Sequence, residues 1–362
     1  MLTRIYIDNF RSFVNFDYRL ERKQLLLGAN GTGKSSLLDA IRYVQRFVKG
    51  VDNPFTQSTR TRWQDRPLQV VEIGAFLEGK EYVYRVEIRF ASDTRQLSVN
   101  LESLRVSGTP VFELANGEIR FFPNDGNQAM AVPLETDESA LYLSRLSNSY
   151  VRRFVEWLES VHCFDIDAYP GKMDESADKE ERQPDYELEN IAGWYRYLVQ
   201  AYPDENARFL ESLRTTLDGF QTLRFSSDED GIRELRAVFA APNKKRVNYS
   251  LSELSDGQRK LIGLYMILHF EMARGHTVFI DEPDNFIALR EIQPWLLAAE
   301  EAVEDHNAQL VVVSHHPELL NQWASEYGLR FFREGNGHVR TERFKLDPDL
   351  QPSELMARGW EG

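Results

Sequence analysis

Cysteine is nearly missing from this 362-residue chain, because Cys163 is the sole example. An internal disulfide is therefore excluded, and we expect a reducing, cytoplasmic location. Long apolar runs are also missing: the longest, residues 261–268, is too short to cross a bilayer. The start of the chain has the pattern of a strand containing Arg4 and Asp8, not that of a secretion signal. We expect no association with membranes.

A net positive charge is missing, because 57 acidic residues outnumber 43 lysines and arginines and give a net charge of −14. A chain this acidic is not broadly attracted to DNA or RNA, so such contact needs a local basic patch and is expected to be weak from this chain alone. Candidate patches are Arg60 with Arg62 and Arg66, Lys244 with Lys245 and Arg246, and Arg152 with Arg153. Solvated surface side chains are the simpler interpretation of all three.

Internal repeats, heptad runs and low-complexity tracts are missing as well, which excludes solenoids and long coiled coils. The composition, 42% hydrophobic and 28% charged, is that of a globular protein. In the first part of the chain we predict strands within 2–27, a helix over 34–49, and a β-rich segment over 68–122 with turns at 78–80 and 116–117. We then predict helices over 137–165 and 187–219, and a mobile charged loop over 173–185.

The last part of the chain alternates between helical and strand patterns. The predicted order is a helix over 256–274, a strand over 277–281, a helix over 290–305, a strand over 309–314, a helix over 317–325 and a hairpin turning near 335–337. Such alternation predicts an α/β fold, with a parallel sheet covered by helices.

The string GANGTGKS, from Gly28 to Ser35, lies between a predicted strand and a predicted helix. This is the setting of a phosphate-binding loop, where glycines let backbone N–H groups point at phosphate oxygens. Lys34 is expected to reach the β- and γ-phosphates of ATP, and the Ser35 hydroxyl to bind Mg²⁺. The candidate nucleotide contacts here are Asn30, Gly31, Thr32, Gly33, Lys34, Ser35 and Ser36.

Two further strings place polar side chains at the ends of apolar strands. In VFIDEPD, we expect Asp281 to hold Mg²⁺ and Glu282 to polarise the attacking water. An acidic loop that caps the next helix is the alternative. In VVVSHHP, His315 is placed to sense the γ-phosphate, while His316 is a competing assignment that spacing does not remove.

The string LSDGQ, residues 254–258, opens a predicted helix. Ser255 is a natural N-cap and Asp256 favours the positive end of the helix, which is a sufficient structural explanation. The functional interpretation is that Ser255, Gly257 and Gln258 close over the γ-phosphate of an ATP bound by a second subunit. It makes the chain a candidate homodimer.

These four elements in this order resemble the ATP-binding-cassette superfamily, in its SMC-like and RecF-like branch often called "AAA family ATPase". The strings IYIDNFRSF, SSLLDAI, DEPDN and SHHPELL carry the resemblance, which covers roughly residues 2–50 and 250–362. It implies an ABC/SMC-type P-loop head with a parallel-sheet core, an N-terminal antiparallel β subdomain and an inserted helical module. The segments would be 1–135, 136–249 and 250–362.

The resemblance also implies a mechanism. Two chains stack head to tail, and each ATP lies between Lys34 of one chain and Ser255 of the other. Lys34, Glu282 and His315 would be the catalytic groups, with ATP and Mg²⁺ as cofactors. The resemblance further implies control of a separate effector, such as a nuclease or toxin, in prokaryotic anti-phage defence. The alternatives are a RecF-like DNA repair ATPase and an ATP-dependent scaffold with little turnover.

Several features depart from the family pattern. Asp256 stands where transporters have glycine, and an acid near the γ-phosphate would slow or tune hydrolysis. Three glutamines, Gln57, Gln64 and Gln69, compete for the role of Mg²⁺ sensor, and either Arg11 or Ser12 would flank the base. The chain lacks a zinc hook, and with 47 residues after His315 we expect no Toprim nuclease of the OLD type. A transporter cassette is disfavoured by the 218 residues between the two key strings.

Overall fold

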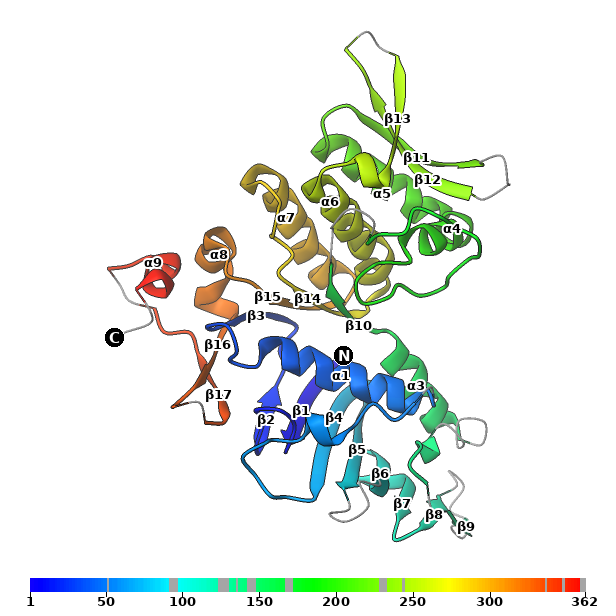
Figure 1. The fold of residues 1–362 in the computed structure, drawn as a ribbon, viewed down its shortest axis with the longest axis vertical. Helices are drawn as coiled ribbons and strands as arrows, with labels where there is room; N and C mark the ends of the chain where they lie inside the picture. The colour runs from blue at the N-terminus through cyan, green and yellow to red at the C-terminus, as the bar shows by residue number, and fades with distance from the viewer. Residues whose placement is uncertain are drawn as a thin grey trace. The chain divides into compact units, whose positions relative to one another are not determined.

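The computed structural model describes residues 1–50, 52–90, 97–122, 130–134, 136–141, 148–166, 172–227, 233–242, 245–335, 337–346 and 349–358. The chain forms two compact units. The first unit is Met1–Val161 with Tyr327–Lys345, and the second unit is His162–Glu326 with Leu346–Gly362. These bounds differ from the three segments expected from the sequence, which stay a prediction. Figure 1 labels the helices and strands.

An eight-stranded antiparallel sheet makes up much of the first unit, in the order β2-β1-β4-β5-β6-β7-β8-β9. Its strands are β1 Leu2–Asp8, β2 Phe16–Arg19, β4 Leu68–Leu77, β5 Lys80–Phe90, β6 Leu97–Val106, β7 Thr109–Ala115, β8 Glu118–Phe121 and β9 Met130–Pro133. The predicted strands near the start and the predicted β-rich segment are thereby confirmed. Figure 1 shows this sheet in blue to cyan.

Two-residue turns connect several of these strands. The predicted turns at Glu78–Gly79 and Asn116–Gly117 are confirmed, with φ of 47° and 77° at the first and 54° and 70° at the second. Positive φ at both central residues is the conformation whose twist matches that of paired strands. A third such turn, Ser107–Gly108, has φ of 47° and 81° and was not predicted.

Parallel strands occur in both units. In the first unit, β3 Lys23–Leu27 pairs in parallel with β16 Gly328–Arg333, which pairs antiparallel with β17 Val339–Arg343. In the second unit, β14 Thr277–Asp281 pairs in parallel with β15 Gln309–Val313, and β10 Val161–Asp165 lies beyond β14. Every residue of β14 and β15 is buried, as expected for parallel strands.

Helices flank these strands as the alternating pattern predicted. They are α1 Lys34–Val48, α6 Asp256–Met266, α7 Leu289–Asp305, α8 Pro317–Tyr327 and a short α9 Pro352–Ala357, of which α9 was not predicted. The helix predicted over 256–274 continues beyond α6 as a π-helical turn, Ile267–Glu271, and a 3₁₀ turn, Met272–Arg274. Among the described residues, none of the helices has the length and hydropathy needed to cross a bilayer.

The helical predictions in the middle of the chain were partly wrong. Of the helix predicted over 137–165, residues 140–141 and α3 Ser149–Glu159 are helical, and residues 142–147 lie outside the described part of the chain. Its last five residues form the strand β10 because they are mostly buried beside β14. The helix predicted over 187–219 divides into α4 Ile191–Ala201 and α5 Pro203–Thr216, since Pro203 has no N–H to continue the first helix.

A three-stranded antiparallel sheet was missed altogether in this middle region. Its strands are β11 Phe220–Ser227, β12 Arg233–Ala240 and β13 Arg246–Ser250. The inserted module is therefore not purely helical. Lys244 of the candidate basic patch lies outside the described residues.

The charged segment 173–185 contains no helix or extended strand among its described residues, in agreement with a loop. Its backbone is nevertheless held in place. The Asp174 N–H donates to the Glu189 carbonyl at 2.7 Å, the Glu181 N–H donates to the Gly193 carbonyl at 3.0 Å, and the Met173 side chain is buried. The loop therefore lies against its neighbours, and its mobility stays a prediction.

His269, on the π-helical turn, makes folding depend on pH. Its Nε2 lies 2.8 Å from the Ser212 hydroxyl, and burial, together with Arg208, lowers the pKa of His269 from 6.5 to about 4. Below pH 6.5 the unfolded chain binds this proton more readily, so stability is lost as pH falls toward 4. Between pH 7 and pH 5 we expect a loss of about 1–2 kcal/mol that His269→Gln removes.

Urea unfolding at the two pH values measures this difference. The exposed His306 provides the matched control, because His306→Gln should keep the wild-type pH dependence. An equal loss of stability in wild type and in His269→Gln would contradict the assignment.

Candidate functional site

The phosphate-binding loop lies between β3 and α1, as predicted. Gly28, Gly31 and Gly33 have φ of 139°, 79° and 105°, values that side chains other than glycine rarely adopt. A Cβ at Gly28 would lie 2.2 Å from the Phe331 carbonyl oxygen on β16. A Cβ at Gly31, by contrast, would meet no described atom within 4 Å, so this side of the loop faces open space.

Lys34 and the N-terminal end of α1 bring positive charge to this loop. Lys34 is 7% exposed, and its Nζ donates to the carbonyl oxygens of Gly28 at 2.6 Å and Ala29 at 3.2 Å. The first turn of α1, all of it described, contains no acidic residue, so the positive end of the helix dipole is not neutralised locally. Asn30 and Ser35 are exposed beside it. The arrangement fits an anion such as a nucleotide phosphate.

An aromatic and basic cluster next to the loop was missed by sequence reasoning. Arg333 donates to the Gly31 carbonyl at 3.2 Å, and its guanidinium lies 5.5 Å from the centre of the Trp63 ring. Trp63, 48% exposed, also stacks with His338 at a ring separation of 6.0 Å. An exposed tryptophan in a loop was the available signal, but nothing in the sequence connects residue 63 with residue 333.

Arg11 and Ser12, the two residues expected to flank the base of the nucleotide, lie in different surroundings. Arg11 donates to the Ser36 hydroxyl at 3.2 Å and forms an ion pair with Asp39, so it lies beside the first turn of α1. Ser12 is 9% exposed, and its carbonyl accepts from Val339 N–H at 3.0 Å. Of the two, Arg11 presents the more exposed side chain.

The three candidate glutamines differ in their surroundings. Gln69 is 1% exposed and donates to the carbonyls of Asn9 and Thr59 at 2.9 and 3.0 Å, so its amide stabilises the fold. Gln57 and Gln64 instead line a cavity of about 430 Å³. The amide oxygen of Gln64 is buried there without a hydrogen-bond partner among the described residues. Which of Gln57 and Gln64 would sense Mg²⁺ stays a prediction.

In the second unit, the string LSDGQ forms the start of α6. The Ser255 hydroxyl accepts from the Gln258 N–H at 3.3 Å, and Gln258 Oε1 accepts from the Ser255 N–H at 3.0 Å, which makes a reciprocal capping box. Asp256 forms an ion pair with the almost fully buried Arg259. Arg259 therefore compensates part of the charge of Asp256, and the expectation that this acid slows or tunes hydrolysis stays a prediction.

The turn after β14 is strained and lies against this helix start. Glu282, with φ of 46°, is in the left-handed region that non-glycine residues seldom occupy. Its carboxylate accepts a hydrogen bond from Asn285. A Cβ at Gly257 would lie 2.5 Å from the Phe286 carbonyl oxygen, so only glycine allows α6 to approach the turn this closely. Asp281, at the end of the strand, is 7% exposed.

A buried lysine near these carboxylates was not among the predicted site residues. Lys260, 3% exposed, donates from Nζ to the Glu282 carbonyl at 2.6 Å. Burial lowers the pKa of Lys260, while Asp284, Asp165, Glu282 and Asp281 oppose that shift. Lys260 follows the string LSDGQ by two residues, but the sequence does not show that it faces residue 282.

The histidine pair after β15 is partly resolved by hydrogen bonds. His316 Nδ1 accepts from the Glu318 N–H at 3.2 Å, and the His316 N–H donates to the Ser314 hydroxyl at 2.9 Å. Ser314 in turn donates to Asp284 at 2.6 Å. His316 thus caps the start of α8. The assignment of His315 stays a prediction.

The structure distributes the predicted site between the two units. Lys34, Ser35 and the other loop residues belong to the first unit, whereas Asp281 and Glu282, together with Ser255, Gly257, Gln258 and His315, belong to the second. Each half has the local geometry described above. That the halves act together is part of the function proposed below.

The candidate basic patches are partly neutralised. Arg66 forms an ion pair with Asp8 at 3.3 Å, and Arg153 forms one with Glu78. Arg60 lies over the Phe90 ring at 5.3 Å. These contacts favour the interpretation as surface side chains.

The chain is similar to several known proteins. The family model described as "AAA domain, putative AbiEii toxin, Type IV TA system" matches residues 25–321. A curated relative, the DNA replication and repair protein RecF of Cronobacter sakazakii, is 28% identical over 165 residues, which are 43% of this chain and 38% of that protein. The chain thus spans well under half the length of that relative. The SMC head domain from Thermotoga maritima covers 95% of this chain and 99% of its own at 14% identity, with a TM-score of 0.48.

The family match extends over most of the chain and includes both the phosphate-binding loop and the strand ends at residues 281 and 313. The chain therefore belongs to the family described as "AAA domain, putative AbiEii toxin, Type IV TA system".

Proposed function

We propose that this protein binds and hydrolyses ATP as a head-to-tail dimer and uses that cycle to control a separate effector that acts on nucleic acid. The observation that carries the proposal is the phosphate loop. A buried Lys34, three glycines at positive φ and the uncompensated end of α1 support the binding of a triphosphate in this loop.

Each remaining group has a role in this proposal. Lys34 would bind the β- and γ-phosphates, and Ser35 and Asp281 would hold Mg²⁺, which when bound neutralises developing phosphate charge. Glu282 would orient and polarise the attacking water. His315 would donate a hydrogen bond to the γ-phosphate. The strained φ of Glu282 supports a functional role, since such strain clusters at active sites.

The dimer is supported by the surroundings of the signature residues. Ser255 is exposed at the start of α6, Gly257 is buried against the Phe286 carbonyl, and the adjacent turn exposes Phe286 by 69% and Leu289 by 45%. Large exposed apolar side chains beside a polar helix end are typical of contact surfaces. We propose that this surface meets the phosphate loop of a second copy.

Mixing two inactive variants tests this arrangement. Lys34→Ala inactivates the loop, whereas Ser255→Asp keeps a good N-cap residue but brings a negative charge to the γ-phosphate. Each variant alone should hydrolyse ATP at background rate. In an equal mixture, half the dimers are mixed and each has one intact site, so activity should recover to about one quarter of wild type.

The same experiment has a clear negative outcome. If each subunit completes its own site, the mixture stays as inactive as the separate variants. Ser325→Asp provides a matched control, because Ser325 is an exposed serine on α8 outside the signature and its substitution should leave activity near the wild-type level. Thermal unfolding of each variant checks that the fold is kept.

Control of an effector is supported by the family description and by the charge of the chain. The family description names a toxin of a toxin–antitoxin system, and the acidic net charge of −14 favours a switch that acts through a partner. A role in anti-phage defence would follow from such a pairing. Direct DNA binding is the second candidate function, favoured by the similarity to a protein named for DNA replication and repair. The two are separated by the DNA-binding measurement given in the Discussion.

A further inference from the structure

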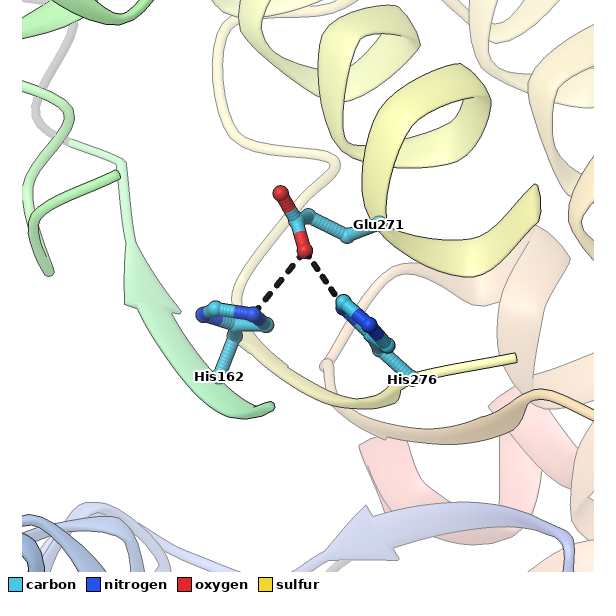
Figure 2. A group of neighbouring side chains, drawn as sticks. All are labelled: His162, Glu271 and His276. Atoms are coloured by element: carbon cyan, nitrogen blue, oxygen red, sulfur yellow. Dashed lines mark hydrogen bonds and ion pairs between the residues drawn. The ribbon is translucent and has the colours of Figure 1, made fainter. Parts of the chain in front are cut away.

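A cluster of metal-ligating side chains lies in the second unit, apart from the residues considered above. His162 comes from β10, Glu271 from the π-helical turn and His276 from the residue before β14. One ligand atom of each lies within 4.8 Å of the other two. Figure 2 shows the Glu271 carboxylate between the two imidazole rings. It is the single group of this kind among the described residues.

The distances within the cluster are compact. Glu271 Oε2 lies 2.9 Å from His162 Nε2 and 2.6 Å from His276 Nδ1. Its other oxygen, Oε1, binds Arg274 at 2.6 Å, which fixes the orientation of the carboxylate. Ligands around a tetrahedral zinc ion lie about 3.3 Å apart, so the rings would move outward by about half an ångström to admit one.

The backbone around Glu271 has special conformations on both sides. The π-helical turn Ile267–Glu271 places this carboxylate, and Gly275, with φ of 75°, turns the chain so that His276 faces it. Single π-helical turns are frequent at functional sites. Glu271 and His162 are buried, with exposures of 1% and 8%, while His276 is 22% exposed. Solvent therefore has access to one side of the cluster.

We propose that His162, Glu271 and His276 bind a divalent transition metal ion of the zinc class. Two imidazole nitrogens and one carboxylate oxygen suit zinc and its neighbours, not Mg²⁺ or Ca²⁺, and water supplies the remaining position on the side of His276. The ion connects three elements: β10, the π-helical turn that follows α6, and the start of β14. It stabilises the second unit, independently of the proposed ATPase activity.

The competing explanation is a network in which both rings donate N–H groups to Glu271 and no metal binds. The double variant His162→Gln/His276→Asn separates the two explanations. The amide nitrogen of glutamine reaches the position of Nε2 and that of asparagine the position of Nδ1, so both donors to Glu271 are kept. The ring nitrogens that a metal requires are removed.

The experiment uses tag-free, full-length protein without nucleotide, stripped with a chelator and titrated with Co²⁺ and Zn²⁺. We expect one ion per chain, the visible absorption of a low-coordinate Co²⁺ site, and a thermal midpoint raised by about 5 °C at about a hundredfold excess over Kd. The double variant should lose all three signals. His306→Gln, an exposed histidine outside the cluster, should keep them.

Asp281→Asn distinguishes this site from the proposed Mg²⁺ position, because it should bind Co²⁺ as wild type does. Wild type that binds no Co²⁺ at micromolar concentration overturns the proposal. Equal binding by wild type and the double variant overturns it as well. Neither outcome affects the proposed function, since that rests on Lys34 and its loop.

Discussion

Replacing Lys34 by alanine is expected to abolish ATP turnover and weaken nucleotide binding. The Lys34 ammonium is almost fully buried in the loop, where it donates to two backbone carbonyls. Removing a hydrogen bond from a charged group costs about 1.5–3 kcal/mol, or about tenfold to a hundredfold in ATP affinity. Turnover should fall by about 10²–10³-fold, because the charge that stabilises the transition state is lost.

Binding of a fluorescent ATP analogue and release of phosphate measure the two effects. Lys49→Ala is the matched control, since Lys49 is an exposed lysine next to the other end of the same helix. It should leave affinity and turnover unchanged. Wild-type turnover in Lys34→Ala would show that hydrolysis occurs elsewhere or belongs to a contaminant.

Replacing Glu282 by glutamine is expected to stop hydrolysis while preserving ATP binding. The substitution keeps the size of the side chain and its contact with Asn285, and removes the charge that polarises water. General-base catalysis contributes about 10²–10⁴-fold, so turnover should fall within that range. Because the ATP-bound form can no longer hydrolyse its nucleotide, the dimer should accumulate with ATP and be observed by size-exclusion chromatography with light scattering.

Glu304→Gln, an exposed position on α7, is the control and should behave as wild type. A Glu282→Gln protein that stays monomeric at saturating ATP would contradict the proposed head-to-tail dimer. Negligible turnover already in wild type, with ATP-dependent dimerisation intact, would support the scaffold alternative.

The trapped dimer also decides between the two candidate functions. A DNA-binding ATPase should lose affinity steeply with salt, whereas a partner-dependent switch should show almost no DNA binding by itself.

The strongest sequence signals were those of local geometry. The glycine pattern predicted the loop before Lys34, and the two-residue turns at 78–79 and 116–117 followed from residues that accept positive φ. The apolar runs ending at Asp281 and Val313 predicted buried parallel strands, because strands covered on both faces need apolar side chains throughout. These features depend on neighbours in the sequence, so they could be predicted without a structure.

The errors arose where burial overrode local preference. Residues 161–165 follow a helix and carry mixed residue types, yet they form a strand because β14 offers an edge beside them. The sheet of β11, β12 and β13 was missed for a similar reason, since its pairing partners are brought together by turns with weak sequence signals. Strand propensity depends on such neighbours more than helix propensity does.

The sequence by itself predicted the local elements of a nucleotide site: a phosphate loop with Lys34, acids at 281 and 282, and a capped signature helix. Only the tertiary structure decided which polar and charged side chains are already engaged in contacts within the fold. It pairs Asp256 with Arg259, occupies Gln69 in the fold, and places Lys260 against the Glu282 carbonyl. The reason is physical, since hydrogen bonds and ion pairs between residues far apart in the sequence depend on distances that composition and spacing do not contain.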